Sequence, residues 1–483
     1  MTENGYRFEP LHRKGPLLGL GWPQLAVLAL CALSAVSFLR AWPSAVGVVA
    51  ALAVLALGGM ACGSRAGRPL LGWGLVVARY CARSRDARGG PPASTAMVQG
   101  EGAERRVVLV HRRAPRPLEG LASDVEVVEV GGDAQGGPLG AVWDRGQGTL
   151  AAVLSTTGPG FSLEDRVDQE RRLAAWAGVL ESVGGSGSGL ARLQWCQRAR
   201  QDDGGDLLRR VLEGGRPGAA GCPGPPLLDQ LRQDQRRLLE LVARDAWRHE
   251  SLLVVAVPCP GRRPALVERA GRALRTQVGG LRSQLLATGL YCDGPLGAAT
   301  MAAALRSGLG SGAVGPPGRL AVREAWSAVA VGELWHRTFW VGEWPLSHVA
   351  PDFLSPLLSA PGARSFSVVM RPLPAERAAR DAESSRTSQL ADAQLRAQGG
   401  FLETARQRRR AEAVEGREAD LADGRVAFEF AGYVSLSAQG EAALEEASAE
   451  LVGSAARAGL RLYPLYGQQA AALTWTLPLG RGL

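Results

Sequence analysis

The stretch RVAFEFAGYVSLSA (residues 425–438) is followed by EAALEEASAELVGSAARAG (441–459) and then by LRLYPLY (460–466). The first and third pieces are rich in aromatic and β-branched residues, which is typical of strands. The middle piece repeats its apolar residues at intervals of three and four, which is typical of an amphipathic helix. This part of the chain therefore predicts a strand, a helix and a second strand.

The residues before this stretch indicate the same alternation. RTFWVGEW (337–344) and SFSVVMRPLP (365–374) have strand composition, and DFLSPLLS (352–359) between them predicts a short helix. The combined order, β-α-β-β-α-β, is the ferredoxin-like pattern. A charged stretch at 375–423, interrupted at Gly399-Gly400, separates the two halves and predicts two helices in a hairpin with ionic outer faces.

The whole chain has 483 residues, enough for two or three domains with sizeable cores. Strands and helices alternate from residue 93 onward, which predicts an α+β (mixed α/β) body without a fixed-period repeat. One helix of the body is expected to begin at Ser162, as its N-cap. Another is expected to cover Leu227–His249. The expected segments are an N-terminal tail at 1–15, a helical hairpin at 16–62, a basic helix and linker at 63–92, an α/β domain at 93–309 and an α+β domain at 319–483.

Two apolar segments near the N-terminus, 16–39 and 45–62, contain no charged residue. As helices they would be roughly 36 and 27 Å long, close to the ~30 Å hydrocarbon core of a bilayer. Trp22-Pro23 and Trp42-Pro43 place an aromatic ring at the headgroup level and a proline in the first helical turn. The short connection between the segments favours a transmembrane hairpin, with helices at about 17–39 and 45–62, over a cleaved signal peptide.

Basic residues indicate the orientation of this hairpin. The net charge of the chain is +9, and basic residues lie on both sides of the hairpin, whereas its connection holds Arg40 alone. Both ends are therefore expected in the cytoplasm. PLLGWGLVVARYCARSR (69–85) predicts either a basic helix on the inner leaflet or an amphipathic helix packed on the body. The expected membrane-interface anchors are Trp22, Pro23, Trp42, Pro43, Arg65 and Arg68.

No motif in the sequence nominates an active site. The chain has one lysine, Lys14, so the P-loop, which needs a lysine beside the nucleotide phosphates, is absent. GSGAVG (310–315) follows a helical pattern instead of the strand that a dinucleotide loop needs, and the cysteines and histidines lack metal-ligand spacing. RQRRR (406–410) has acidic neighbours, which indicates a solvated helix face. We therefore expect no enzyme activity, no cofactor, no metal and no direct contact with nucleic acid.

Several of these stretches resemble known families. FWVGEWP, PDFLSPLLS, SFSVVMRPLP and the closing LTWTLPL (473–479) resemble, in order and spacing, the amino-terminal, non-motor domain of conjugative type IV secretion ATPases. In that family a Leu-Pro like Leu477-Pro478 ends the domain and the motor follows. The N-terminal hairpin resembles the PrgI-like membrane subunit of those systems. YRFEPLHRKGPLLGL (6–20) and WGLVVARY (73–80) are similar to a family of GC-rich Gram-positive bacteria that is encoded among type IV secretion-like genes.

The resemblance implies a structural role at the cell membrane. Because the sequence has no P-loop, the body is expected to be an adaptor that docks a separate P-loop secretion ATPase at the inner face, beside other membrane subunits or further copies of itself. Residues 471–479 are predicted to be either an exposed edge strand that joins the partner's sheet or a strand paired in its own sheet. Two other classes stay open, an EccE-like membrane component of type VII secretion and a membrane-tethered enzyme without a recognisable motif.

Overall fold

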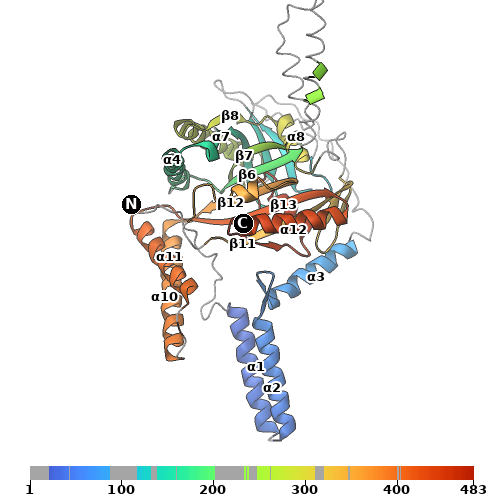
Figure 1. The fold of residues 1–483 in the computed structure, drawn as a ribbon, viewed down its shortest axis with the longest axis vertical. Coiled ribbons are helices and arrows are strands. Elements are labelled where there is room, and N and C mark those ends of the chain that lie inside the picture. Colours follow the sequence, from blue (N-terminus) through green and yellow to red (C-terminus); the bar gives the residue numbers. More distant parts are fainter. Residues whose placement is uncertain are drawn as a thin grey trace, which may run out of the picture.

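The structure is a computed structural model. It describes residues 21–42, 44–86, 117–131, 139–158, 160–185, 187–201, 233–234, 237–238, 247–261, 263–310, 320–345, 349–399, 402 and 404–483. At the N-terminal end lie α1 (Trp22–Ala41), α2 (Ala45–Cys62), β1 (Ser64–Arg65), β2 (Arg68–Pro69) and α3 (Leu70–Asp86). The rest of the described chain forms a mixed α+β body around one large antiparallel sheet (Figure 1).

The first half of the body, residues 125–307, is called the first repeat. It begins with a β-hairpin and continues in the order β-α-β-β-α-β, followed by one more helix. Its elements are β3 (Val125–Val130), β4 (Leu139–Asp144), β5 (Thr149–Thr157), a 3₁₀ turn (Phe161–Leu163), α4 (Arg166–Gly184), β6 (Arg192–Gln201), β7 (Trp247–Pro258), α7 (Pro264–Ala287), β8 (Tyr291–Pro295) and α8 (Ala298–Ser307).

The second half, residues 322–475, is called the second repeat because it has the same order of elements. They are β9 (Val322–Glu324), β10 (Val329–Val331), β11 (Leu334–Glu343), α9 (Ser355–Leu358), β12 (Ala363–Pro372), α10 (Ala375–Gln398), α11 (Ala405–Ala422), β13 (Phe428–Gln439), α12 (Glu441–Arg457), β14 (Arg461–Pro464) and α13 (Gln469–Trp475). The α10–α11 pair is inserted between β12 and β13. The β-α-β-β-α-β order that the sequence predicts for the C-terminal part is thus present twice.

The strand pairing shows that the two repeats are built alike. The sheet runs β3-β4-β5-β7-β6-β12-β13-β11-β10-β9, and this order reads the same from either end once each strand is replaced by its counterpart. In both repeats the first strand of the β-α-β-β-α-β unit pairs near its start with the preceding hairpin and near its end with the last strand, β8 or β14. An internal repeat therefore exists in the topology of the fold, although the sequence shows no fixed period.

The two repeats join through β6 and β12, which pair antiparallel at the centre of the sheet. Cys196 lies opposite Ser367, and each is the fifth residue of its strand, so the junction has an approximate two-fold axis. Trp195 and Phe366 pack edge to face across it, with ring centroids 5.7 Å apart. The joined sheet is one continuous layer, and neither repeat exposes this edge.

Helices cover both faces of the sheet. On one face α4 and α7 pack over the first repeat, and α9 and α12 pack over the second. On the other face α8, α13 and the buried leucines that follow α13 fill a shared apolar core against strands of both repeats. The mixed α+β class predicted from the sequence is confirmed.

Three predictions about individual elements need correction. The N-cap position of helix α4 is Asp165 instead of Ser162, because the 3₁₀ turn takes up the residues before it, and the Asp165 side chain makes no capping hydrogen bond. His249 lies in strand β7 instead of ending a helix, and the start of that predicted helix lies outside the described residues. The segment predicted as the last strand is helical, as α13.

Candidate membrane-facing surface

Helices α1 and α2 form an antiparallel hairpin that projects from the body (Figure 1). Small residues lie where the two helices meet: Ala35 and Ala51 are buried, and a Cβ added to Gly58 would come within 3.1 Å of the Cys31 Cβ. Small side chains allow helix backbones to approach closely, which is how helices associate where no hydrophobic effect drives them together. The contact between α1 and α2 is therefore of the kind found between membrane helices.

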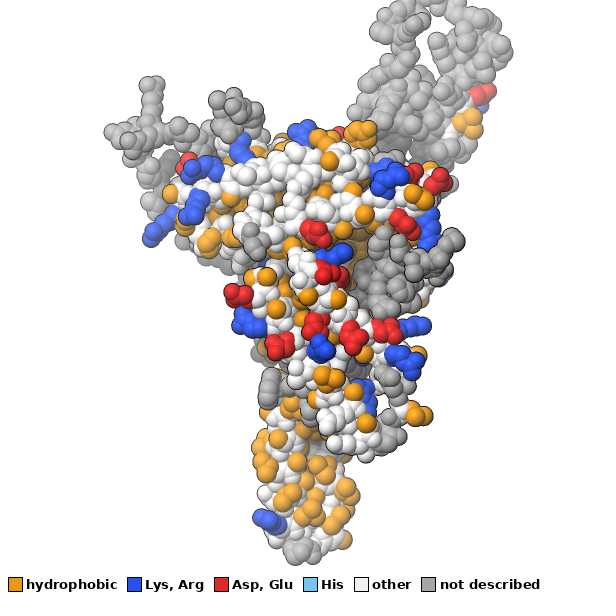
Figure 2. Space-filling view, turned by 90° about the vertical axis from the view of Figure 1, so that its left-hand side faces the viewer, with side chains coloured by type: hydrophobic (Ala, Val, Ile, Leu, Met, Phe, Trp, Pro, Cys, Tyr) orange, Lys and Arg blue, Asp and Glu red, His pale blue; other side chains and the backbone are white. Residues whose placement is uncertain are grey.

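The outer surface of the hairpin is apolar on all sides. Arg40 is the one charged residue between positions 22 and 62. Figure 2 shows hydrophobic side chains covering this projection. Ten leucine and valine side chains are 44–67% exposed: Leu30, Leu33, Val36, Leu39, Val46, Val48, Val49, Leu52, Leu55 and Leu57. An exposed apolar surface of this kind marks a site that is covered by lipid or by another protein.

The two helices differ in how well they fit a bilayer. By length and composition, Pro23–Ala41 is the one helix in the described residues that could cross a membrane, and the apolar part of α2, Ala45–Gly59, is shorter. A near-N-terminal helix of this kind is weak evidence by itself, because signal sequences pass the same test. The two predicted helices are present, and a double crossing of the bilayer stays a prediction.

The predicted aromatic and proline anchors lie at the two ends of α1. Trp22 is its first residue, and Pro23, the second, is exposed. Trp42 directly follows α1 at the far end of the hairpin, is mostly exposed and packs on Phe38 with ring centroids 6.5 Å apart. Pro43 lies outside the described residues. Trp42 is thus placed where an interfacial aromatic would lie if the hairpin crossed a bilayer.

The arginines after α2 are arranged differently from the prediction. Arg65 and Arg68 face each other in the short β1–β2 ladder. The Arg68 guanidinium is half-buried against the second repeat beside Tyr433, and burial lowers its pKa. Burial also raises the pKa of Tyr433 to about 12, although the positive charge of Arg68 opposes this shift. Arg68 therefore fastens the base of the hairpin to the body, which corrects its prediction as a headgroup anchor.

A tight turn holds the same region against the body. Ala66 and Gly67 have φ angles of 49° and 76°, in the left-handed region that favours glycine. A Cβ on Gly67 would come within 3.0 Å of the Trp340 ring and 3.2 Å of the Tyr463 ring. The turn is thus seated on two aromatic side chains of the second repeat.

Helix α3 packs on the body through an aromatic cluster. Trp73 and Tyr80 on α3 contact Trp326 with ring centroids 6.0 and 5.2 Å apart, and Trp73 also contacts Tyr466 at 6.0 Å. Trp326 and Tyr466 stack on each other at 6.2 Å. Of the two alternatives that the sequence left open, the structure shows the one in which this helix packs on the body. The aromatic cluster itself is not evident from the sequence, because its members are far apart in the chain.

Polar contacts extend this attachment to the end of α3. The Arg83 Nε lies 3.3 Å from Glu324 Oε2, and its Nη2 donates to the backbone oxygen of Gly467. All of these described contacts of the hairpin base and α3 are with the second repeat. Figure 1 agrees: α3 lies between the body and the base of the α1–α2 hairpin. The opposite side of α3, which includes exposed Leu75 and Cys81, carries no charge at positions 74, 75, 78, 81 and 82.

Most of the predicted partner-binding segment at 471–479 is buried in the structure, although Ala471 is exposed. Leu473, Leu477 and Leu479 are fully buried, and so are Thr474 and Thr476 between them. The segment forms α13 and a turn, and it packs into the core shared by both repeats. It therefore offers neither an exposed edge strand nor a paired strand, which corrects both versions of the prediction.

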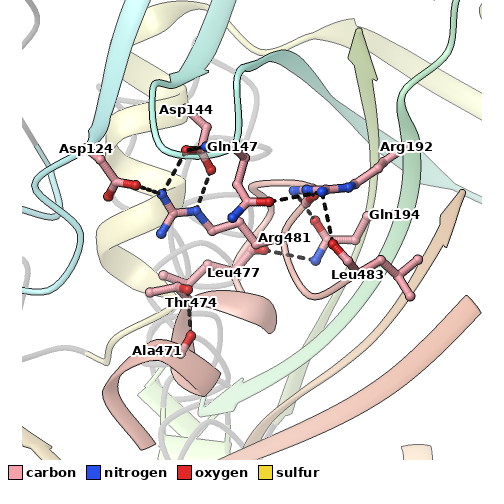
Figure 3. Close-up of polar contacts among 11 residues, drawn as sticks. Asp124, Asp144, Gln147, Arg192, Gln194, Ala471, Thr474, Leu477, Arg481 and Leu483 are labelled. Carbon is pink, nitrogen blue, oxygen red and sulfur yellow. Dashed lines mark hydrogen bonds and ion pairs between the residues drawn. The ribbon is translucent and has the colours of Figure 1, made fainter. Parts of the chain in front are cut away.

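Hydrogen bonds tie the residues after α13 to the first repeat (Figure 3). The Gln194 Nε2 donates to the backbone oxygens of Trp475 and Leu477, both at 3.0 Å, and its Oε1 accepts from the Gly480 N–H at 2.7 Å. Arg192 donates to the backbone oxygens of Gly480 and Leu483, each at 2.9 Å. The segment thus connects the second repeat back to β6 of the first.

An ion pair completes this connection. Arg481 contacts Asp144 through Nε–Oδ2 at 2.5 Å and Nη2–Oδ1 at 2.9 Å, and it contacts Asp124 Oδ2 at 2.5 Å. Both carboxylates raise the pKa of Arg481 and outweigh the opposing effect of its burial. The arrangement is a structural latch between the repeats, in which the charges of Arg481, Asp144 and Asp124 pair with one another.

Within the described residues, no group of three or more His, Cys, Asp or Glu side chains could hold a metal ion. A scan of the chain against protein-family models gives no match. A search of curated proteins likewise gives no significant match.

Proposed function

We propose that this chain is a membrane-anchored structural component of a type IV secretion-like machine. Its α1–α2 hairpin crosses the cytoplasmic membrane twice, and its body lies on the inner face and carries a separate P-loop ATPase. The observation that supports the anchor is the outer surface of the hairpin, where ten large apolar side chains are exposed and no charge lies between Trp22 and Arg40. The secretion setting rests on the resemblance of the sequence.

Transfer into lipid is the simplest way to cover this surface. Covering the exposed part of each leucine or valine is favourable by roughly 1 kcal/mol, so the ten together contribute on the order of 10 kcal/mol. Helix α1 has 20 residues and is about 30 Å long, which suits a ~30 Å hydrocarbon core, whereas α2 has 18 residues, is about 27 Å long and has a shorter apolar part, Ala45–Gly59. All helical backbone groups between the ends are paired within the helices, as a bilayer demands.

The distribution of basic residues gives the orientation. Arg40 is alone at the far end of the hairpin, whereas Arg7, Arg13 and Lys14 precede α1 and further arginines follow α2. Segments rich in arginine and lysine stay in the cytoplasm. The body, which is attached at the base of the hairpin, is therefore on the cytoplasmic side.

The first repeat is the half that we propose for contact with the ATPase. The contacts of the hairpin base and α3 occupy the second repeat, through Tyr433, Trp326 and Glu324. Figure 1 shows the first repeat on the side of the body away from the hairpin. A partner that approaches from the cytoplasm would meet this half first.

Membrane topology can be tested on the full chain expressed in bacteria. We expect it to stay in the membrane pellet after an alkaline carbonate wash. A protease should cleave both the N-terminal tail and the body in inverted vesicles and neither in intact spheroplasts. Release by carbonate, or cleavage of the tail and the body from opposite sides, would contradict the anchor.

The partner can be tested by photo-crosslinking, since the chain has a single lysine and amine-reactive reagents are unsuitable. A photoreactive amino acid at exposed Leu163 in the first repeat should capture a P-loop ATPase, and one at exposed Val452 in the second repeat is the matched control. Capture at Val452 alone would place the contact on the other half. Capture of type VII secretion subunits, or ATP hydrolysis by the purified chain alone, would contradict the proposed function.

A further inference from the structure

The α10–α11 hairpin is an arm that the sheet does not require. Strands β12 and β13 pair without interruption up to Pro372 and Phe428, and the arm leaves the sheet beyond them. Arg386 Nη1 holds the two helices together through both oxygens of Glu418, at 2.7 and 2.6 Å, and Gln389 donates to the backbone oxygen of Arg410. Buried Ala382 and Val414 lie nearer the body. The arm is therefore held together by its own contacts, and the pairing of the sheet does not explain why it projects from the body.

Charge is distributed unevenly along this arm. Its half next to the body, residues 375–387 and 411–423, has eight acidic residues and four arginines, a net charge of −4. Its outer half, residues 388–410, has five arginines and two acidic residues, a net charge of +3. The outer half therefore carries the positive charge of the arm, close to where the two helices connect.

Apolar exposure is concentrated in the same outer half. Leu390, Leu395 and Leu402 are exposed by 64%, 43% and 92%. No described residue in the half next to the body is an exposed large apolar side chain. Exposed leucines beside arginines are the composition of segments that lie in the headgroup region of a membrane, where the leucines enter the acyl boundary and the arginines meet phosphate.

The direction of the arm brings this outer half toward the anchor. Figure 1 shows the α10–α11 arm leaving the body on the same side as the α1–α2 hairpin. The free end of the arm extends past the level at which α1 begins, and it lies beside the hairpin instead of above it. A bilayer whose inner surface lies near the start of α1 would therefore meet the outer half of the arm, and the free end of the arm would enter that surface.

We propose that the outer half of the α10–α11 arm, residues 388–410, binds the anionic inner surface of the same bilayer as a second membrane contact. This inference rests on the proposed function, because it needs the α1–α2 hairpin to be in the membrane. Leu402 and its neighbouring leucines enter the interface, and Arg408, Arg409 and Arg410 face lipid phosphates. The anchor keeps the arm near the surface, so that even a weak contact is populated.

A lipid surface fits these observations better than an acidic protein. The leucines and arginines lie around one free end that faces the membrane level, whereas an acidic protein partner would approach the body from the cytoplasm. Each arginine near an anionic surface contributes about 1 kcal/mol, or about five-fold in the binding equilibrium. Three adjacent arginines thus account for roughly 100-fold.

The test uses the full chain reconstituted in vesicles, with an environment-sensitive fluorescent amino acid at position 402. Vesicles contain phosphatidylcholine alone or phosphatidylcholine with phosphatidylglycerol, and brominated lipid serves as the quencher. The matched control carries the same probe at Ser384, an exposed position on α10 next to the body. A third chain carries it at Leu52, on the outer surface of α2.

We expect bromolipid to quench the probe at 402 in vesicles with phosphatidylglycerol, much less in phosphatidylcholine alone, and not at 384. The triple variant R408Q/R409Q/R410Q should weaken the contact at 402 by roughly 100-fold. A probe at 402 that stays in water while the probe at 52 is quenched would overturn this inference and leave the anchor standing. Water exposure at both 402 and 52 would overturn the anchor itself. Burial of 402 only on addition of a protein partner would also overturn the lipid contact.

Discussion

Replacing Arg481 by methionine should release the C-terminal segment from the first repeat. Methionine keeps an apolar stem of similar length but removes the charge that pairs with Asp144 and Asp124. The Asp144 carboxylate is fully buried, and it also accepts a hydrogen bond from the backbone N–H of Gln147, at 2.9 Å. The R481M variant therefore leaves a buried negative charge with most of its compensation removed.

The expected cost follows from the burial of this pair. Removing one partner of a buried ion pair costs about 3–5 kcal/mol, because the other charge remains in the interior. The Asp124 side chain is 40% exposed, so its share is at most about 1 kcal/mol. We expect the opening of the segment to become more favourable by 3–5 kcal/mol in total, which is roughly a 150- to 4000-fold change in its equilibrium constant.

Hydrogen–deuterium exchange measures this opening directly. The amides of residues 469–483 should exchange faster in R481M by that factor, while those of α7 change much less. The double variant D144N/R481M removes the buried charge as well, and it should recover at least half of the loss. Exchange in R481M within about five-fold of the wild-type rate would refute the reasoning, since it would mean a contribution of less than about 1 kcal/mol. A double variant no better than the single one would refute it as well.

Three further predictions address the anchor, α3 and a buried histidine. L52R should cost about 2.5–3.5 kcal/mol of membrane insertion and lower the carbonate-resistant fraction, whereas L163R on the exposed surface of the body should not; equal fractions would contradict the lipid contact of α2. W326A removes three ring contacts and should loosen α3 by about 2–4 kcal/mol, measured as faster amide exchange over residues 70–86; unchanged exchange there would contradict the aromatic attachment. Burial lowers the pKa of His336 from its ordinary 6.5 to about 4. Between these two pH values the histidine is protonated in the unfolded chain and neutral in the folded chain. The stability from this effect is complete above pH 6.5 and falls by about 2 kcal/mol by pH 5, so urea unfolding of H336Q should be less pH-dependent than wild type, and equal slopes would disprove this.

Local pattern predicted the elements whose environment is simple. The strand-like runs at 337–344 and 365–374 became β11 and β12, and the charged stretch at 375–423 became the α10–α11 arm. The strand segments are rich in apolar and β-branched residues and the arm is rich in charged ones, which matches their buried and exposed environments. Local composition reports that difference directly.

The C-terminal segment shows where the same reading fails. Leu473, Trp475, Leu477 and Leu479 alternate with Thr474, Thr476 and Pro478, and this largely apolar run predicts a strand. In the structure Thr474 and Thr476 are as buried as the leucines, because the segment is enclosed on all sides between the repeats. Alternation then carries no information about a sheet, and the partner surface predicted at this segment does not exist.

The repeat and the seating of the anchor were beyond local pattern for another reason. The two repeats share strand order and register but differ in the segments inserted after β6 and β12, so no constant spacing links equivalent residues. Arg68 meets Tyr433, and Trp73 meets Trp326, across hundreds of residues. Such contacts depend on the assembled sheet, and a single sequence does not display them.

The central β6–β12 pair has a consequence for how the molecule can divide its tasks. The two repeats are joined edge to edge, as the two subunits of a homodimer would be. Because both belong to one polypeptide, their sequences can differ. Because the two central strands are antiparallel, their last residues, Gln201 and Pro372, lie at opposite ends of the β6–β12 pair. The second repeat can therefore specialise in attaching the α1–α2 hairpin, while the first repeat, which has the opposite orientation, can bind a different partner.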